Sequence, residues 1–326
     1  MLSVFSTCKT NWTCYQRLSR CHKPRLRMAA GTDYIGAVVF LSALNMFLSI
    51  TAILGNILIL FALYKVSSLH SPTKLLFRCL AVTDLLVGLI TQPLFVVTIM
   101  SEVPKVNFNS LCLYYAGRVM SSSSYLLCTV SVLTSTAISL DRLLALLMGL
   151  RYRHVVTSKR VFAVITCFWF IGVSCGGLYL WRNDIAWSVA QALIIISLVT
   201  SAFSYVKIYL KLYSQQRKLH IQREEHHVHR EQIKSGRTER YKRIVASIWW
   251  VQLAMLACYI PFIIVASLRI YGGIDGHGLQ MARRVVVTFT YFNSSLNPFL
   301  YCWKIAEVRQ AVKDAICRPL NCCNSN

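Results

Sequence analysis

Seven long apolar runs follow one another along the chain, separated by short polar or charged segments. Each run has about 20 residues or more, the length that an α-helix needs to cross a bilayer. The runs are continuous rather than alternating, which favours helices over the strands of a membrane barrel. We expect the spans at about residues 35–64, 75–100, 111–143, 161–180, 185–213, 244–268 and 285–303.

An apolar stripe continues after the last span, at Ile305, Val308, Ala311, Val312 and Ile316. This spacing of three to four residues predicts an amphipathic helix on the membrane surface. The predicted fold class is an all-α membrane protein, a seven-transmembrane helix bundle with a short amphipathic eighth helix. Its parts are an extracellular segment at 1–33, the bundle at 34–303, and the amphipathic helix with a cytoplasmic tail at 304–326.

The chain is 56% hydrophobic and 14% charged, with a formal net charge of +23. A basic chain suggests nucleic acid, but here the basic residues lie between apolar spans, where they indicate topology and contacts with lipid headgroups. Most of the 35 lysines and arginines follow spans one, three and five or lie in the tail. The positive-inside rule therefore predicts a multi-pass membrane protein with its N-terminus outside and its C-terminus in the cytoplasm.

Both ends of the chain carry candidate modification sites. The first 33 residues lack the apolar region of a signal peptide, and translation from Met28 would make 1–27 an extension. Asn11 begins an Asn-Trp-Thr glycosylation sequon, which is relevant only if this end is outside. The thirteen cysteines show no regular metal-ligand spacing, and three that follow the amphipathic stripe are predicted to be palmitoylated, namely Cys317, Cys322 and Cys323.

Several polar residues lie deep inside apolar spans, where a side chain facing lipid would be costly. We therefore expect Asp84, Asn56, Ser131, Asn293 and Asn297 to point into the bundle.

Prolines interrupt three of the apolar runs. Pro93, Pro261 and Pro298 should kink their helices, and Pro298 also frees a backbone carbonyl. An Asp141-Arg142 pair at the end of span three suggests a charged latch at the membrane face, with an interfacial anchor as the alternative.

Taken in order, these pieces resemble the rhodopsin-like (class A) G protein-coupled receptors over about residues 34–317. The matching stretches are Gly55-Asn56, Leu80-Ala-Val-Thr-Asp84, Asp141-Arg142-Leu143, Trp169, Cys258-Tyr-Ile-Pro261 and Asn297-Pro-Phe-Leu-Tyr301. The resemblance implies binding of an extracellular ligand in the outer half of the bundle and activation of a heterotrimeric G protein by outward movement of helix six. Its departures, a very short 181–184 loop without cysteine and Ser197 where proline is usual, are nearest to the melanocortin, cannabinoid and adenosine-type group.

The resemblance assigns roles by matching position. A sodium site, with the ion as an allosteric ligand and no other cofactor, matches Asp84, Ser131, Asn293 and Asn297, and a polar packing network without an ion is the alternative. Coupling and activation match Asp141, Arg142, Tyr205, Tyr259, Pro261, Asn297, Pro298 and Tyr301, although Tyr259 stands where the family usually has tryptophan. The ligand pocket matches Arg118, Ser121, Ser124, Tyr259, Phe262 and Tyr291.

The pocket positions disfavour two ligand classes of the family. Ser124 replaces the aspartate that binds amines, and Tyr291 replaces the lysine that binds retinal. A cationic amine would lack a buried counter-ion, which is costly. The outer ends also carry an excess of arginine, at Arg118, Arg182, Arg269, Arg283 and Arg284 against Glu102, Asp184 and Asp275. We expect a lipid-like or anionic ligand, unless these arginines merely flank lipid headgroups.

The residues at the start of span six predict signalling without ligand. The position that often holds an acidic partner for Arg142 is Tyr241, and Glu239 lies two residues earlier. Two residues turn a helix by roughly 200°, so Glu239 should face away from Arg142. The Tyr241 hydroxyl restoring the latch is the alternative.

Two other function classes fit the sequence less well. A seven-pass transporter or channel would call for internal repeats or charged residues along a path, but no repeat is present and Asp84 is the single acid deep in a span. An enzyme is disfavoured because no catalytic motif occurs, so no catalytic residue is assigned. His226, His227 and His229 lie in a charged loop, where solvation is favoured over metal binding.

Overall fold

The computed structural model describes residues 32–65, 70–104, 106–225, 253–268 and 277–304, together with 309, 310 and 312. Within these residues all regular elements are helical, which confirms the predicted fold class. The elements are α3 (Thr32–Lys65), α4 (Ser71–Leu86), the π turn η2 (Val87–Thr91), α5 (Gln92–Met100), α6 (Ser110–Met148), the 3₁₀ turn η3 (Gly149–Arg151), α7 (Tyr152–Val155), α8 (Ser158–Trp181), α9 (Asn183–Glu225) and α11 (His277–Lys304). A further apolar helix covers Leu253–Leu268.

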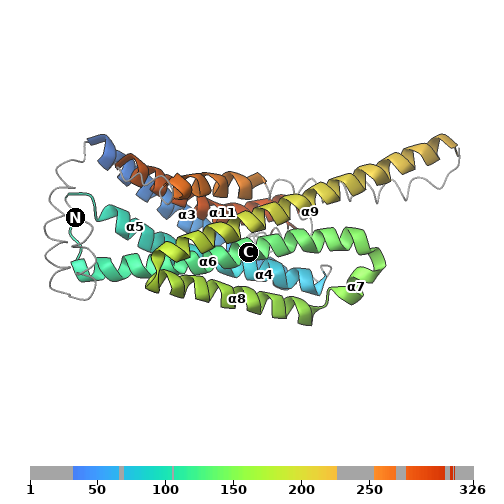
Figure 1. Cartoon of the computed structure of the whole chain (residues 1–326), viewed down its shortest axis with the longest axis horizontal. Coiled ribbons are helices and arrows are strands. Elements are labelled where there is room, and N and C mark those ends of the chain that lie inside the picture. The colour runs from blue at the N-terminus through green and yellow to red at the C-terminus, as the bar shows by residue number, and fades with distance from the viewer. Residues whose placement is uncertain are drawn as a thin grey trace, which may run out of the picture.

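The long helices run lengthwise beside one another (Figure 1). Within the part of the chain that the structure describes, five helical segments are long and apolar enough to cross a membrane, and they coincide with the first five predicted spans. Of the sixth predicted span the structure describes Leu253–Leu268, and α11 contains the seventh.

Glycines on α8 let that helix approach α6 closely. A Cβ atom on Gly172 would lie 2.6 Å from Val130 Cγ2, and one on Gly176 would lie 2.9 Å from the Ser122 carbonyl oxygen. Contacts under about 3 Å are not tolerated by carbon atoms, so larger residues would push the helices apart. The position of α8 against α6 thus depends on these two glycines.

The second predicted span, which comprises α4, η2 and α5, is irregular near Pro93, where the sequence predicts a kink. The π turn Val87–Thr91 lies directly before α5, whose second residue is Pro93. Proline has no N–H to donate, and its ring would clash with the carbonyl of the preceding turn. In the π turn the backbone N–H of Gln92 donates to the Val87 carbonyl, five residues earlier, so the wider turn ends directly before the proline.

Helix α9 is much longer than the predicted span at 185–213. It has 43 residues, so it is about 65 Å long, roughly twice the hydrocarbon thickness of a bilayer. It projects past the other described helices (Figure 1). Hydropathy predicts where a helix leaves the membrane but not where it ends, and no proline follows to end it. At its other end only Arg182 separates α8 from α9.

Several predictions fall outside the described residues. These concern the extension 1–27, Asn11, the histidines His226, His227 and His229, Glu239, Tyr241, and the cysteines Cys317, Cys322 and Cys323. Of the predicted amphipathic helix, residues 309, 310 and 312 are described as helical. Val312, on its apolar stripe, packs against the core cluster that contains Ile59, Leu63 and Tyr152.

Candidate functional site

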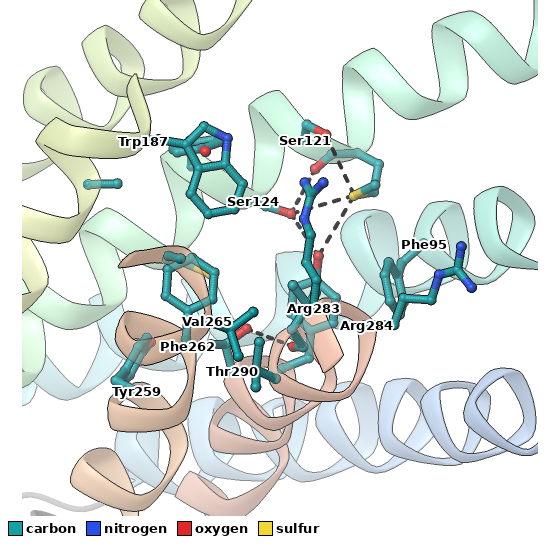
Figure 2. A pocket seen from close by; sticks show the side chains of 18 of the residues that line it. Phe95, Ser121, Ser124, Trp187, Tyr259, Phe262, Val265, Arg283, Arg284 and Thr290 are labelled. Atoms are coloured by element: carbon teal, nitrogen blue, oxygen red, sulfur yellow. Dashed lines mark hydrogen bonds between the residues drawn. The ribbon is translucent and has the colours of Figure 1, made fainter. Parts of the chain in front are cut away.

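A cavity of about 400 Å³ is lined by residues at the end of α5 and at the start of α11. Figure 2 shows the cavity from close by, with Ser124, Trp187 and Arg283 among its labelled lining residues. Its lining comes from α5, α6, α9, helix Leu253–Leu268 and α11. Five of the six residues that the sequence assigns to a ligand pocket line this cavity, namely Ser121, Ser124, Tyr259, Phe262 and Tyr291. Most other lining side chains are apolar, so the cavity suits a largely apolar ligand.

Arg118, the sixth assigned residue, is not among the residues that line the cavity. Its guanidinium donates to the Leu180 carbonyl oxygen at 2.8 Å and lies 5.8 Å from the centre of the Tyr114 ring. The side chain is therefore directed toward α8, and the structure does not bring Arg118 into the pocket.

Four consecutive serines on α6 contact different neighbours. Ser122 donates to the Gly176 carbonyl at 3.0 Å, and the Ser123 hydroxyl lies 3.2 Å from that of Thr91. Ser121 and Ser124 line the cavity instead. Because successive helical residues are turned by about 100°, a short polar stretch can both fix α6 and supply polar groups to the cavity.

The cavity is crossed by a hydrogen bond between α6 and α11. The hydroxyls of Ser124 and Tyr291 are 2.8 Å apart, and Tyr291 is 1% exposed. The Phe95 ring contacts Tyr291 edge to face, with centroids 5.5 Å apart. A ligand at this level therefore meets the hydroxyl groups of Ser124 and Tyr291.

The wall beside α9 is aromatic. Trp187 stacks on Phe262 with centroids 5.7 Å apart, and it meets Tyr125 edge to face at 6.2 Å. The Arg283 guanidinium carbon lies 5.0 Å from the centre of the Trp187 ring, a cation–π contact. Trp187 stands in no motif that predicts a pocket residue, although the very short 181–184 loop, which brings the start of α9 to this end, was a usable signal.

A second polar group lies at the mouth of the cavity. Arg284 of α11 forms an ion pair with Glu102, just after α5, and donates to the Tyr34 hydroxyl of α3. Tyr34 in turn donates to Glu102 at 2.7 Å. Glu102 and Arg284 both line the cavity, and their charges offset one another.

Asp84 lies fully buried in the middle of the bundle. Asn297 donates to one carboxylate oxygen at 2.7 Å, and Ser131 reaches the other at 3.5 Å. Ser294, which the sequence analysis did not assign, also donates a side-chain hydrogen bond to it. Asn293, the remaining assigned residue, is buried on α11. A carboxylate with hydroxyl and amide neighbours is a donor set that suits a small hard cation.

The Gly55-Asn56 pair of α3 packs against the proline-containing part of α11. Pro298 has no N–H, which leaves the carbonyl of Ser294, four residues earlier, without its usual donor. Asn56 donates to that carbonyl oxygen at 3.2 Å. A Cβ atom on Gly55 would lie 2.8 Å from Pro298 Cγ. Glycine thus permits the close approach of α3 that lets Asn56 satisfy the freed carbonyl.

At the far end of α6, Asp141 is buried and has three polar partners. Arg142 lies 3.2 Å from it, while Thr73 donates at 3.0 Å and Tyr152 at 2.6 Å. We call Thr73, Asp141, Arg142 and Tyr152 the Asp141 cluster. The sequence predicts the Asp141–Arg142 pair but not Thr73 or Tyr152, because neither stands in a recognisable motif.

The remaining residues assigned to coupling lie on three helices. Tyr205 of α9 is buried, with its hydroxyl 3.0 Å from that of Ser139, and it packs beside Leu143. Tyr259 is 2% exposed, and Pro261 follows two residues later on the same helix. The side chain of Tyr301 lies outside the described part of the chain, although its backbone belongs to α11.

A family model described as "7 transmembrane receptor (rhodopsin family)" matches residues 55–183 and 177–301. Melanocortin receptor 5 of Rattus norvegicus is 23% identical over 277 residues, covering 83% of this chain and 82% of that protein. The histamine H2 receptor of Cavia porcellus is 27% identical over 319 residues, covering 90% and 84%. Adenosine receptor A2a of Canis lupus familiaris is 23% identical over 310 residues, covering 86% and 73%.

Proposed function

The chain belongs to the rhodopsin family of seven-transmembrane receptors, and from this premise we propose that it couples an extracellular ligand to a heterotrimeric G protein. The observation that carries the proposal is the layout of α6, which lines the cavity with Ser124 and forms the Asp141 cluster at its far end. Roughly 25 Å of continuous helix separate the two. A ligand contacting Ser124 thus acts on the helix that holds Arg142.

The ligand is not a simple amine. Among the described lining residues the single carboxylate is Glu102, which already bonds to Arg284 and Tyr34. A buried ammonium group would have to displace that ion pair or remain without a counter-ion, and either is costly. The histamine receptors among the relatives therefore do not suggest a ligand for this chain, and a lipid-like or anionic molecule fits the lining better.

Activation in this proposal is an outward movement of the helix that contains Pro261, which opens the Asp141 cluster to the G protein. Arg142 then receives the G protein, while Tyr205 and Tyr301 support the open state. Tyr259, Asn297 and Pro298 connect the cavity to that end of the bundle. Tyr259 lines the cavity and packs in one buried cluster with Val132, Ile194 and Met255, which supports this path.

We further propose that sodium binds at Asp84 with oxygen atoms of Ser131, Asn293 and Asn297, and stabilises the inactive receptor. A cation that prefers one conformation shifts the equilibrium toward it. Support comes from the buried carboxylate and its polar neighbours.

A multi-pass receptor of this family resides in the plasma membrane. We place residues 1–33 outside the cell and 304–326 in the cytoplasm, with the bundle at 34–303 between them. The distribution of lysine and arginine supports this orientation. Partners are the G protein, the extracellular ligand and membrane lipids. A transporter or channel is not favoured.

A ligand screen with a G protein readout tests the proposal. We expect activators among anionic or uncharged amphiphiles, with potency reduced by Ser124→Ala and by Tyr291→Phe. Potent activation by a simple biogenic amine would overturn the ligand assignment. Solute flux without any G protein response would overturn the receptor assignment in favour of transport.

A further inference from the structure

Helix α3 meets η2, α5 and α11 at a place that is rich in buried polar groups. Asn45 of α3 donates to the Thr288 hydroxyl of α11 at 2.9 Å. Four residues later on α3, the Ser49 hydroxyl donates to the Gly88 carbonyl oxygen of η2 at 2.8 Å. We call the region between Asn45, Thr288 and Gly88 the polar seam.

Three buried side-chain atoms beside the polar seam have no hydrogen-bond partner among the described residues. They are the amide oxygen of Asn45 and both polar atoms of the Gln92 amide, at the start of α5. Both residues are 0% exposed. The Asn45 nitrogen already donates to Thr288 and to the Leu41 carbonyl, so its oxygen remains as an acceptor. A buried polar group without a partner costs free energy, and inside a bilayer no bulk water compensates it.

The Gln92 side chain is directed toward α3. Gly88, four residues earlier, faces α3, because a Cβ atom there would lie 3.1 Å from the Ser49 carbonyl oxygen. Four residues turn an α-helix about 40° past one full turn, and the wider π turn rotates less per residue, so Gln92 keeps nearly the direction of Gly88. Thr91 points elsewhere, since its hydroxyl lies 3.2 Å from that of Ser123 on α6.

Asn45 and Gln92 also lie at the same level of the bundle. Their helices belong to consecutive spans and therefore run in opposite directions. Asn45 precedes Ser49 by four residues, and Gln92 follows Gly88 by four, so both lie roughly 5–6 Å from the Ser49–Gly88 contact on the same side. Beyond them the two helices share a buried apolar cluster that contains Val38, Leu41, Phe95 and Ile99. The two amides thus face the same seam without bonding to each other.

We propose that the polar seam binds at least one ordered water molecule, which bridges the Asn45 oxygen and the Gln92 amide. A buried water needs two to four polar partners, and the seam offers two amide oxygens and one amide nitrogen. The water accepts from Gln92 Nε2 and donates to Asn45 Oδ1, and a second water can donate to Gln92 Oε1. A cation would satisfy the two oxygens but leave the nitrogen unpaired. The inference depends on neither the ligand nor the G protein.

The water bridge lies directly behind a wall of the ligand cavity. Phe95, three residues after Gln92, lines the cavity and contacts Tyr291. Thr288, the partner of Asn45, lies three residues before Tyr291 on α11. Asn45 and Gln92 are not among the residues that line the cavity. The bridge therefore holds α5 and α11 to α3 from behind, without contacting a ligand.

Electron cryomicroscopy of the full-length receptor in nanodiscs, at a resolution that shows ordered water, tests the proposal. We expect a density peak within hydrogen-bond distance, about 2.7–3.2 Å, of both the Asn45 oxygen and the Gln92 amide. The peak should be absent in Gln92→Leu, which removes one partner. A direct bond between the two amides, or a wild-type seam without a peak, would overturn the proposal.

Thermal unfolding of the purified receptor gives an independent measure. Asn45→Leu and Gln92→Leu should each lower the midpoint temperature, because each leaves the other amide without its bridge. The double variant should fall no further than Asn45→Leu alone, because the second leucine replaces an amide that is already unpaired. Midpoint changes that simply add would overturn the proposal.

Gln191→Leu is the matched control for the double variant. Gln191 is also a buried glutamine, but it donates directly to the Ser267 hydroxyl at 2.9 Å, and it shares no partner with Asn45. Its effect on the midpoint temperature should therefore add to that of Asn45→Leu. The same departure from additivity in the pairs with Gln191 and with Gln92 would show that no bridge is specific to the polar seam.

Discussion

Tyr152 makes the shortest of the contacts to Asp141, and its removal should raise signalling without ligand. The hydroxyl donates to one carboxylate oxygen at 2.6 Å, while Thr73 and Arg142 contact the other. Tyr152→Phe deletes this donor and keeps the ring, which packs in the core cluster with Leu76 and Ile138. The substitution thus isolates the hydrogen bond from the packing.

The expected magnitude follows from the charge and burial of the acceptor. A hydrogen bond to a charged group contributes about 1.5–3 kcal/mol. Asp141 keeps its Thr73 and Arg142 partners, so we take the lower end, about 1.5 kcal/mol. If the bond exists only in the resting receptor, the active fraction rises about tenfold from a small starting value. Thr73→Val should have the same sign and a smaller effect, because its distance is longer.

Ligand-free guanine-nucleotide exchange in membranes, at matched surface expression, is the assay. Tyr115→Phe is the control, because this tyrosine is 55% exposed at the opposite end of α6. Ligand-free exchange that is equal in Tyr152→Phe, Tyr115→Phe and wild type would refute the reasoning that the Asp141 cluster holds the resting state.

Three further predictions concern packing, the ion and the base of helix six. Gly172→Ala should destabilise the purified receptor by about 1–3 kcal/mol in thermal unfolding, because its Cβ would lie 2.9 Å from a backbone oxygen of α6. Gly177→Ala on the same helix is the control. Its Cβ would meet nothing within 4 Å, so this substitution should be neutral or slightly stabilising. Equal effects would contradict the packing argument. Sodium should weaken agonist binding in radioligand competition, and Asp84→Asn should abolish this dependence; agonist affinity that ignores sodium in the wild type would remove the ion site. Tyr241→Glu should lower ligand-free exchange by giving Arg142 an acidic partner, and no measurable ligand-free exchange in the wild type would show that Tyr241 already closes the latch.

Much of the fold could be predicted because the bilayer restricts it strongly. A span needs about 20 apolar residues and must satisfy its own backbone, so continuous runs indicate helices directly. Helix ends are less well specified, and α9 continues to Glu225 because its polar extension still favours helix and contains no proline. The sequence predicts an irregularity near Pro93, but it does not show that this irregularity is the π turn Val87–Thr91.

Residues of the candidate site could be predicted where a polar side chain facing lipid would cost free energy. Asp84 and Asn56 had to face inward, and both do, with hydrogen bonds to Asn297 and to the Ser294 carbonyl. Partners from other helices were not predictable. Thr73 and Trp187 are unremarkable in sequence, and only the packing of α4 and α9 against their neighbours brings them to Asp141 and Arg283.

The direction of the Arg118 side chain could not be predicted from the sequence. Its position on α6 suggested that it lines the pocket. A long flexible side chain can adopt several directions, however, and the Arg118 guanidinium donates to the Leu180 carbonyl of α8. Matching by position identifies the part of the helix, and the neighbouring helix decides where the charged group lies.

Guanine-nucleotide exchange on purified heterotrimeric G proteins, driven by the purified receptor in nanodiscs, tests the central claim most directly. The account predicts faster exchange than with empty nanodiscs for at least one class of G protein, and a return to the empty-disc rate in Arg142→Ala. Exchange at the empty-disc rate with every class, by a folded receptor that carries a ligand in its cavity, would contradict the account.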